Sequence, residues 1–396
     1  MMGLGYIGLP TAALMAAKNL NVHAVDVNPD VVSTINRGEI HIVEPALDGL
    51  VKHGVERGYL KAFLEPVSAP VYLIAVPTPF KNDHEPDLAY VESAVKMILP
   101  VLAEGQLVVI ESTSPVGTTE KMNALVEAVR PELKGKVYFA YCPERVLPGN
   151  VIEELSNNDR VIGGLDVKST ELATAFYGKF VKGQLHQSQA RTAEMCKLVE
   201  NASRDVSIAF ANELSIICDK AGIDVWELIR LANRHPRVNI LQPGTGVGGH
   251  CIAVDPWFIV HDFPEEAVII RKARELNNYK TEWVIEKIKN ASLAFELKNK
   301  RKPVIACLGL AFKPNIDDLR ESPAVSVVKV LMKENCVLKV VEPHVREVEG
   351  IEIVPFETAV SEADLVVALV KHDIFAQLRL KPGIEVLDFC GLLNHA

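Results

Sequence analysis

One cysteine, Cys251, follows a run of glycines in the segment 242–256, which reads Gln-Pro-Gly-Thr-Gly-Val-Gly-Gly-His-Cys-Ile-Ala-Val-Asp-Pro. Glycine permits positive φ angles and lets a ligand approach the backbone closely, so this thiol is placed to meet a small molecule. Asp255 follows near enough in sequence to orient a water, a base or the loop itself. A buried thiol beside a flexible turn explains these residues equally well, because free cysteine is among the most buried residue types.

A second glycine cluster, Gly3-Leu4-Gly5-Tyr6-Ile7-Gly8, matches the dinucleotide-binding fingerprint. Its first glycine permits a tight turn, its second admits a pyrophosphate, and its third lets a helix pack on a strand. We expect that helix at about 9–18, with its N-terminus facing the anion. The apolar strand predicted at 22–26 ends in Asp26, where a carboxylate would hold the ribose hydroxyls and repel a 2′-phosphate. The cluster therefore favours NAD over NADP, and it tips Cys251 towards a ligand site.

The chain starts close to this fingerprint. Only Met1 and Met2 precede Gly3, whereas a strand usually needs ~5 residues. The first strand is central in the doubly wound order. We therefore expect either a stub strand or a chain that continues before Met1.

The elements that must position these residues alternate between strands and helices. Each predicted strand leads into a polar loop, and ligands in such sheets bind at the carboxyl ends of strands, so the loops are expected to line a cleft. Simple turn chemistry is the alternative for each loop, since Pro, Ser and Thr are common in turns. The strands are expected at 71–76, 107–110 and 137–141, the loops at 77–79, 111–118 and 142–145, and helices at 88–102 and 118–129.

From about Thr192 the pattern becomes helical. A long helix at 192–221 carries Lys197 and Asn201 four residues apart, hence on one face. For this pair taken alone, a solvated polar face is the favoured interpretation. Helices at 224–233 and 265–297 complete this middle block. A second α/β region follows, with strands at 304–308, 337–341, 365–369 and 385–387 and a helix from Pro323 to about Lys333.

The predicted fold is thus α/β, with two Rossmann-like doubly wound domains joined by a helical middle domain with a long central helix. The expected boundaries are 1–190 for NAD binding, 191–299 for the helical middle and 300–396 for the second α/β domain. In the last of these, Lys313 and Arg320 could hold phosphates, or pair with neighbouring acids.

Composition narrows the class of protein. The chain has 396 residues, 48% of them hydrophobic and 23% charged, which is ordinary for a globular protein of two or three domains. The net charge of -9 argues against a nucleic-acid partner. Seven cysteines show no paired metal-ligand spacing, so we expect no metal. With no recognisable signal peptide and no bilayer-length apolar run, we expect reduced thiols in the cytoplasm and no membrane partner.

Together these motifs resemble the nucleoside-diphosphate-sugar 6-dehydrogenase family over almost the whole chain. The resemblance implies an NAD-dependent two-step oxidation of a UDP-sugar, for a bacterial surface polysaccharide, with Cys251 forming a thiohemiacetal and then a thioester. Independently of the resemblance, the long helix is a candidate seam of a homodimer, because a long apolar stripe between two domains needs a partner. The matching segments are 3–8, 76–79, 112–118, 143–145, Lys197 with Asn201, 248–255 and 308–323.

Residue roles follow from the same resemblance. The implied catalytic residues are Cys251, Lys197, Asn201, Asp255, Glu144 and Thr118. Those implied to contact NAD are Gly3, Gly5, Tyr6, Ile7, Gly8, Asp26, Val76, Pro77, Thr78, Thr113, Thr118 and Arg320. Those implied to contact the sugar nucleotide are Arg145, Val146, Lys197, Asn201, Arg204, His235, Arg237, Gly248, His250, Phe312 and Lys313.

The identity of the sugar depends on departures from the glucose-oxidising branch. His250, Val254, Arg145 and Pro148 fit the N-acetylhexosamine branch, which favours UDP-N-acetyl-D-mannosamine. Cys390 stands where many relatives carry a basic residue, so a phosphate or subunit contact there is in doubt.

Other functions remain open at this point. UDP-N-acetylglucosamine and UDP-glucose are alternative substrates for the same chemistry. A 3-hydroxyacid dehydrogenase would also place a Lys and an Asn on such a helix, but it needs neither Cys251 nor a second α/β domain. A non-catalytic NAD-binding protein would not need to keep Lys197, Asn201, Cys251 and Asp255.

Overall fold

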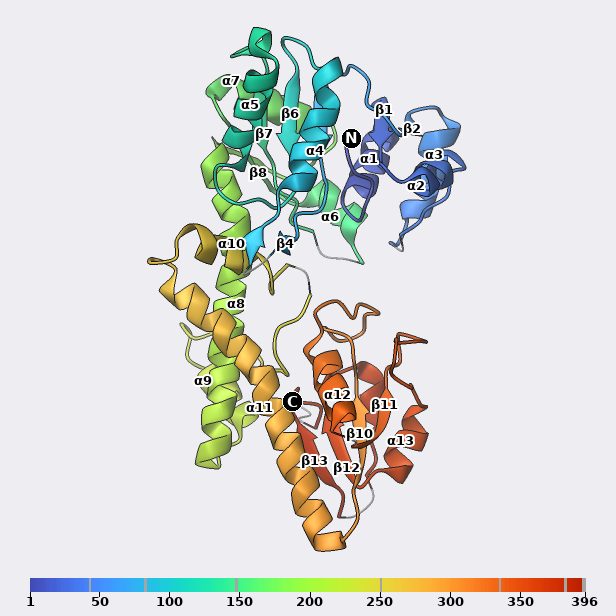
Figure 1. Ribbon diagram of the computed structural model, residues 1–396, viewed down its shortest axis with the longest axis vertical. Coiled ribbons are helices and arrows are strands. Elements are labelled where there is room, and N and C mark those ends of the chain that lie inside the picture. Colours follow the sequence, from blue (N-terminus) through green and yellow to red (C-terminus); the bar gives the residue numbers. More distant parts are fainter. Residues whose placement is uncertain are drawn as a thin grey trace. The chain divides into compact units, whose positions relative to one another are not determined.

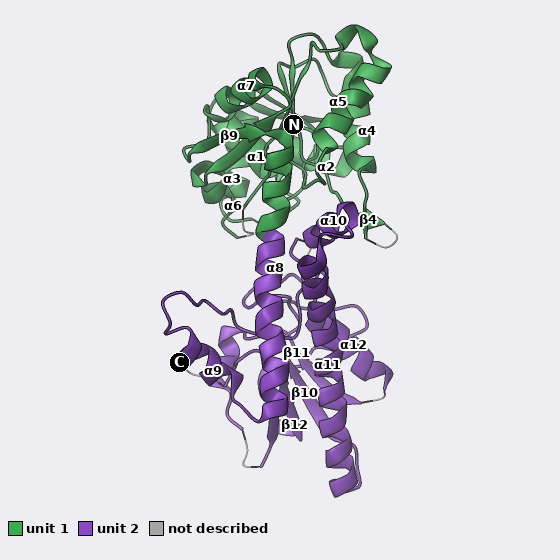
Figure 2. Cartoon of the chain, turned by 90° about the vertical axis from the view of Figure 1, so that its left-hand side faces the viewer, with its two compact units in different colours: residues 1–200 green, residues 201–396 purple. Residues whose placement is uncertain are grey.

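The computed structural model describes residues 1–42, 44–81, 84–146, 149–249, 251–334, 336–380 and 383–393. The chain forms two compact units, residues 1–200 and 201–396 (Figure 2). His250 and Pro148, which were expected to favour an N-acetylhexosamine, lie outside the described residues. The three expected domains, with boundaries near 190 and 299, remain a prediction.

The main sheet of unit 1 follows the order β3-β6-β7-β8-β9. Neighbouring strands run parallel except β7 and β8, which pair antiparallel through Ala140–Gly164 and Tyr141–Gly163. The strands are β3 (Val71–Ile74), β6 (Leu107–Ile110), β7 (Tyr138–Tyr141), β8 (Arg160–Gly164) and β9 (Leu185–Gln189).

The first residues complete this sheet. β1 (Val22–Val25) pairs in parallel with β2 (Leu60–Phe63), and Met2 bridges Val25 on one side and Ile74 on the other. The backbone N–H of Met2 donates to Leu73 O at 2.7 Å, and that of Gly3 donates to Val25 O at 2.8 Å. The segment before the fingerprint therefore lies at the central position predicted for the first strand.

Helices cover both faces of this sheet, as Figure 1 shows. Alternate residues of β6 divide between two apolar cores, because successive side chains of a strand point to opposite faces. Leu107 and Val109 belong to the core that includes α1, α3 and α7, and Val108 and Ile110 to the core that includes α4 and α5. The helices are α1 (Gly8–Ala17), α2 (Pro29–Asn36), α3 (Leu47–Glu56), α4 (Ala89–Ile98), α5 (Thr118–Val129), α6 (Val151–Asn157) and α7 (Val167–Tyr177).

Two 32-residue helices dominate the middle of the chain, α8 (Ala190–Ala221) and α11 (Val268–Asn299). Between them come α9 (Val225–Ala232) and α10 (Asp255–Asp262). Within unit 2, buried Arg274 on α11 pairs with buried Asp205 on α8 at 2.6 Å. Asn277 of α11 donates to Asp205 Oδ1 at 2.8 Å and accepts from Asn212 Nδ2 of α8 at 2.9 Å. A row of polar groups thus fixes α8 against α11.

Unit 2 also contains a four-stranded parallel sheet, in the order β11-β10-β12-β13. Helices α11 and α12 pack on one face, while α13 and η3 (Asp373–Gln377) pack on the other. Chain order reverses between β10 and β12, which makes their carboxyl ends the topological switch point. The strands are β10 (Val304–Leu308), β11 (Val337–Val341), β12 (Leu365–Ala368) and β13 (Glu385–Asp388), and the helices α12 (Pro323–Lys333) and α13 (Phe356–Glu362).

The predicted fold class is confirmed: two main sheets with mainly parallel strands, helices on both faces of each, and a long helix between them in the chain. The short strands β4 (Phe80–Lys81) and β5 (Glu85–Pro86) form a separate antiparallel pair. Antiparallel β8 and the elements α2, α3, α6 and α7 were not predicted. In the part of the chain that the structure describes, no helix has the combination of length and apolar character needed to cross a bilayer.

Candidate active site

The fingerprint loop of unit 1 is shaped for a pyrophosphate. Gly3 has φ +88°, and a Cβ there would lie 2.5 Å from Ala75 O. At Gly8, the first residue of α1, a Cβ would lie 1.9 Å from Gly3 O, so neither position accepts a side chain. A Cβ at Gly5 would meet nothing within 4 Å, which leaves the backbone before α1 open to an anion. These residues fit NAD.

Asp26 is oriented by the same loop. Its Oδ2 accepts from the Leu4 N–H at 3.0 Å and its Oδ1 from the Asn28 N–H at 2.9 Å. A carboxylate has about four acceptor positions, so these two bonds leave capacity for ribose hydroxyls. The strand-end acid predicted from the sequence is therefore present and held against the fingerprint.

Two of the predicted strand-end loops meet through Ser112, which follows β6. Its Oγ accepts from the Val76 N–H at 2.9 Å and donates to Val76 O at 2.7 Å. Thr118 begins α5, and its hydroxyl donates to Pro115 O at 2.7 Å. The Val76-Pro77-Thr78 loop and the loop that contains Thr113 are thus joined at their bases.

Glu194, which the sequence analysis did not name, holds the start of α5. This fully buried carboxylate accepts from the N–H groups of Gly117 and Thr119 at 2.6 and 2.8 Å, and from the Thr119 hydroxyl at 2.7 Å. A negative charge is stabilising at a helix N-terminus, where N–H groups lack intrahelical partners. Glu194 lies on α8 one turn before Lys197, so the helix that carries Lys197 also fixes the Thr118 loop.

Glu144 and Arg145, after β7, are each held by a residue that was not predicted. Glu144 is buried; its Oε1 accepts from the Arg145 N–H at 2.6 Å and its Oε2 from Arg160 at 2.7 Å. The Arg145 guanidinium pairs with Glu200 of α8, through Nε at 3.0 Å and a second nitrogen at 2.7 Å. Val146, next in the chain, is half-buried.

Beneath this loop lies a buried acid, Glu111. Its Oε1 accepts from the Tyr177 hydroxyl at 2.6 Å. Burial raises the pKa of Glu111 to about 7, although the Arg160 charge opposes the shift. Burial also raises the pKa of Cys142, and of Cys307 in unit 2, to about 12. Neither of these thiols is suited to act as a nucleophile at neutral pH.

In unit 2 the chain turns into α10 directly after Cys251. The Cys251 carbonyl accepts from the N–H groups of Val254 and Asp255 at 3.1 and 2.8 Å. Asp255 is the first residue of α10 and is buried. Asn201 of α8 donates from Nδ2 to Oδ2 of Asp255 at 2.6 Å. Two predicted catalytic residues are therefore in direct contact, and Cys251 lies one helical turn away in the chain.

The glycine loop before Cys251 is fixed from three sides of unit 2. The Gly244 N–H donates to Asn212 of α8 at 2.9 Å, and Thr281 of α11 donates to Thr245 O at 3.0 Å. The Gly249 N–H donates to Arg320 O at 3.0 Å.

Contact between this loop and Phe312 leaves no room for a side chain at Gly248. A Cβ there would lie 2.7 Å from both Phe312 Cβ and Glu321 O. The structure thus brings together Gly248 and Phe312, both predicted to contact substrate.

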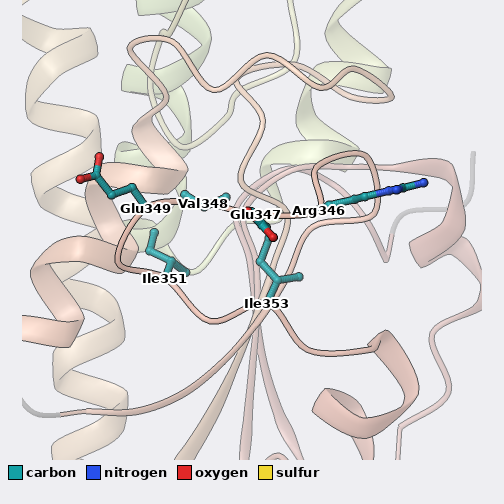
Figure 3. A pocket seen from close by; sticks show the side chains of 6 residues that line it. All are labelled: Arg346, Glu347, Val348, Glu349, Ile351 and Ile353. Carbon is teal, nitrogen blue, oxygen red and sulfur yellow. The ribbon is translucent and has the colours of Figure 1, made fainter.

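The remaining predicted side chains of unit 2 lie at its surface. Arg320 pairs with Asp318 at 2.5 Å, as the alternative interpretation allowed. The exposed residues are Arg204 on α8, His235 and Arg237 after α9, and Lys313 after β10. Figure 3 shows a pocket elsewhere in unit 2, and none of the predicted site residues lines it; its lining is Arg346, Glu347, Val348, Glu349, Ile351 and Ile353.

Comparison with known proteins agrees with this geometry. Residues 1–181, 191–279 and 306–389 match, in turn, the NAD binding domain, the central domain and the UDP binding domain of the UDP-glucose/GDP-mannose dehydrogenase family. The chain is 54% identical to the NDP-N-acetyl-D-galactosaminuronic acid dehydrogenase of Ralstonia nicotianae, over 99% of this chain and 95% of that protein. It is 55% identical to the UDP-N-acetyl-D-mannosamine dehydrogenase of Salmonella typhi, over 98% of this chain and 95% of that protein.

A solved structure gives the same result. The UDP-D-ManNAc dehydrogenase of Pyrococcus horikoshii is 37% identical and superposes with a TM-score of 0.88, covering 100% of this chain and 96% of that one. The fingerprint loop, the loop before Cys251 and the second sheet all support the same family assignment. The chain belongs to the UDP-glucose/GDP-mannose dehydrogenase family, and it is an oxidoreductase that uses NAD.

Proposed function

We propose that this chain oxidises the carbon-6 alcohol of UDP-N-acetyl-D-mannosamine to the carboxylate, a four-electron oxidation that consumes two NAD. The uronate product would serve the synthesis of a bacterial surface polysaccharide. The names of the relatives at 54% and 55% identity support an N-acetylhexosamine as the sugar.

The observation that carries this proposal is the hydrogen bond from Asn201 to Asp255 at the turn that follows Cys251. The Asp255 carboxylate takes one N–H of the Asn201 amide and so fixes the plane of that amide. The second N–H remains a donor in a set direction. A preorganised donor, held at the helix start that follows Cys251 in the chain, is suited to assist attack of the thiol on an aldehyde, because an oxyanion develops as the new bond forms.

In the proposed mechanism Cys251 acts only after the alcohol has become an aldehyde. The Cys251 sulfur forms a bond to carbon 6, and the carbonyl oxygen becomes the oxyanion of a thiohemiacetal. Loss of the carbon-bound hydrogen with two electrons converts this adduct to a thioester. Water then adds to the thioester carbon, the C–S bond breaks, and the thiolate leaves as the carboxylate forms.

The other proposed catalytic residues act on oxygen. Lys197 and Asn201, one turn apart on α8, stabilise the alkoxide of the first step and the oxyanion of the second. Glu144 and Thr118 would orient the hydrolytic water, and Arg160 keeps the Glu144 carboxylate in place.

Substrate and cofactor contacts complete the proposal. NAD, when bound, accepts the two electrons and the hydrogen removed in each oxidation. The residues proposed to hold NAD are Gly3, Gly5, Tyr6, Ile7, Gly8, Asp26, Val76, Pro77, Thr78, Thr113, Thr118 and Arg320. The UDP-sugar would be bound by Arg145, Val146, Arg204, His235, Arg237, Gly248, His250, Phe312 and Lys313, together with Lys197 and Asn201.

The number of NADH formed per sugar tests the covalent mechanism. The wild-type chain and a Cys336→Ala control, which removes another half-buried thiol, should give two NADH and one uronate per sugar nucleotide. Cys251→Ala should give no uronate, while slow exchange between alcohol and aldehyde can persist. Two NADH per sugar from Cys251→Ala at near wild-type rate would contradict the mechanism.

A panel of UDP-sugars tests the substrate. The value of kcat/KM should be highest for UDP-N-acetyl-D-mannosamine, ahead of the galacto and gluco N-acetylhexosamines and UDP-glucose. A preference for UDP-glucose would overturn the N-acetylhexosamine assignment while leaving the reaction class intact.

The working form proposed here is a cytoplasmic homodimer. Phe210 and Ile217, seven residues apart on one face of α8, are 51% and 54% exposed, and such an apolar stripe fits a second copy of the helix. All seven cysteines are free thiols, which fits a reducing compartment. Sedimentation should give a dimer at micromolar concentration and a weakened dimer for Phe210→Glu; a wild-type monomer would contradict the proposal.

A further inference from the structure

We propose that His372 is a positioning residue, which accepts a backbone hydrogen bond at Nδ1 and so holds the loop carrying Phe312 and Lys313 in the form that binds the substrate's nucleoside diphosphate. This inference rests on the proposed function, because it takes Phe312 and Lys313 to be nucleotide contacts. It concerns unit 2 alone.

The two loops involved flank the switch point of the second sheet. One follows β10 and spans 309–315, and the other follows β12 and spans 369–373. They touch at their bases, since Gly309 has φ +92° and a Cβ there would lie 2.5 Å from Val370 Cβ. In open α/β sheets, ligands bind in the crevice between two such loops. The relative position of these loops therefore sets the width of the crevice.

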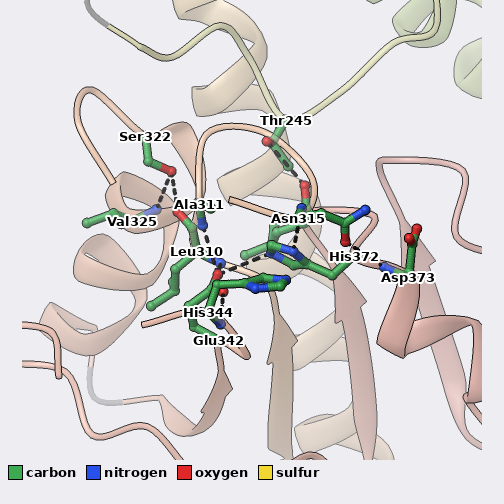
Figure 4. A network of polar contacts seen from close by, with 11 residues as sticks. Thr245, Leu310, Ala311, Asn315, Ser322, Val325, Glu342, His344, His372 and Asp373 are labelled. Atoms are coloured by element: carbon green, nitrogen blue, oxygen red, sulfur yellow. Dashed lines mark hydrogen bonds and ion pairs between the residues drawn. The ribbon is translucent and has the colours of Figure 1, made fainter. Parts of the chain in front are cut away.

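The far end of the first loop is joined to the second by a reciprocal pair of hydrogen bonds, shown in Figure 4. The Asn315 N–H donates to Nδ1 of fully buried His372 at 3.0 Å. In return, the Asp373 N–H donates to Oδ1 of Asn315 at 3.0 Å. Asn315 has φ +61°, in the left-handed region that asparagine adopts more readily than most residues other than glycine.

The near end of the same loop is held by Glu342, which follows β11. Its Oε2 accepts from the N–H groups of Leu310 and Ala311 at 2.7 and 2.9 Å, and its Oε1 from the His344 N–H at 2.9 Å. His372 Nε2 lies 3.2 Å from the same Oε2. Burial tends to raise the pKa of Glu342, but these hydrogen bonds outweigh it and lower the pKa to about 2. Glu342 is therefore a carboxylate that can only accept.

These partners assign the tautomer of His372. Nδ1 faces a backbone donor and must carry a lone pair, and Nε2 faces a carboxylate and must carry the proton. His372 thus links Glu342 to Asn315, and Phe312 and Lys313 lie in the stretch of loop held at both ends. The two residues reach the nucleotide only from the loop conformation that this link maintains.

Protonation would break the link at one defined point. A proton on Nδ1 would face the Asn315 N–H, so that bond would be lost, whereas the contact with Glu342 would strengthen. The other groups against the ring are His344, with ring centroids 4.9 Å apart, and Phe375 at 5.4 Å. Asp373 and Lys371 adjoin His372 in the chain. Loss of the acceptor at Nδ1 should therefore release the loop at Asn315 and weaken nucleotide binding.

Two amide variants, each of which mimics one ring nitrogen, separate the two contacts of His372. His372→Asn places an amide oxygen near the Nδ1 position and can still accept from Asn315. His372→Gln places an amide nitrogen near the Nε2 position and keeps only the contact with Glu342. In His372→Gln the Asn315 N–H would be unpaired, so the KM for the UDP-sugar should rise about tenfold. In His372→Asn this KM should stay within about twofold of the wild-type value. In both variants kcat and the KM for NAD should change little.

The difference between the two variants provides a readout that a packing role would not give, because both replace the ring with a smaller amide and only His372→Asn keeps an acceptor for the Asn315 N–H. Equal losses of affinity in the Asn and Gln variants would overturn the inference.

Calorimetric binding of UDP separates failure of this inference from failure of the proposed function. A wild-type chain that neither binds UDP nor turns over UDP-sugars would refute the proposed function. A wild-type chain that does both, with unchanged UDP affinity in His372→Gln, would refute only the role of His372. If the variants do not fold, ¹⁵N NMR of histidine-labelled wild-type protein decides, since a proton on Nδ1 of His372 at neutral pH would overturn the assignment.

Discussion

The side-chain amide of Asn201 donates to the carboxylate of Asp255 over 2.6 Å, which ties helix α8 to the first residue of α10. The bond spans 54 residues of sequence and ends at the turn that contains Cys251. Since α10 begins at Asp255, the helix N-terminus also favours the negative charge of that side chain. Asp255 thus connects three features: the proposed oxyanion donor Asn201, the start of α10 and the loop that contains Cys251.

The first prediction exchanges the two members of this pair. Asn201→Asp alone places two carboxylates in contact and removes the amide donor, so kcat should fall roughly 10²–10³-fold and the thermal midpoint should drop. The double variant Asn201→Asp with Asp255→Asn restores a hydrogen bond of reversed polarity. It should recover the midpoint but not kcat. Recovery of both would show that Asn201 is not an oxyanion donor.

The second prediction compares two glycines of one loop. Gly248→Ala pushes a Cβ to 2.7 Å from Phe312 Cβ and Glu321 O, whereas at Gly244 the nearest atom would be Gly246 O at 3.9 Å. Contacts that close displace the backbone, so Gly248→Ala should raise the KM for the UDP-sugar at least about tenfold, at a structural cost of about 1–3 kcal/mol. Gly244→Ala should behave like wild type. Steady-state kinetics measure the KM of both variants, and an equal KM in Gly248→Ala and Gly244→Ala would contradict the prediction.

The third prediction separates the charge of Asp26 from its hydrogen bonds. Asp26→Asn keeps an oxygen for the Leu4 N–H but removes the negative charge, whereas Asp26→Ala removes both. Both variants should use NADP better relative to NAD, because the repulsion of a 2′-phosphate is gone. The alanine variant should also bind NAD about tenfold more weakly. Kinetics with both cofactors test this, and an unchanged preference in both would mean that Asp26 does not select the cofactor.

The fourth prediction concerns buried Glu111 and the pH dependence of stability. Its pKa is about 7 in the folded chain, against an ordinary value of 4.5, so the folded state binds the proton more tightly than the unfolded state does. The free energy of unfolding should therefore fall as pH rises from 4.5 through 7, by about 3 kcal/mol from this group.

Glu111→Gln should remove that slope. Urea denaturation at pH 5 and pH 8 measures the difference. Glu104→Gln, at an exposed carboxylate, should leave the slope as in wild type. The same slope in Glu111→Gln and wild type would contradict the prediction.

The parts of the fold that could be predicted are those encoded locally. The strand at Val304–Leu308 and the helices at Thr118–Val129 and Pro323–Lys333 have the predicted bounds, because apolar runs and a proline at the helix start mark their limits. β8 was missed, since its antiparallel pairing with β7 joins residues that no local pattern relates. The helix start at Asp255-Pro256 did carry a signal, a proline in the first turn, and it was not used.

The candidate site shows the same division. The nucleotide role of Asp26 was predicted from residue type and spacing, and the roles of Asn201 and Asp255 from the family resemblance, but the groups that hold such residues were not predicted. Glu194 reaches Thr119 across 75 residues, and His372 reaches Asn315 across 57. No sequence period reports a contact between side chains brought together only by tertiary folding.

The buried row of Asp205, Asn277 and Asn212 restricts the long helices of unit 2 to one alignment. Two helices in contact through apolar side chains alone can slide by one turn, about 5.4 Å, and bury nearly the same surface. The amide and carboxylate groups meet at one alignment only, and any slide would leave them desolvated and unpaired. Such groups add little net stability, but they make every neighbouring alignment costly. Because Asn212 also accepts a hydrogen bond from the Gly244 N–H, the same alignment fixes the position of the loop before Cys251.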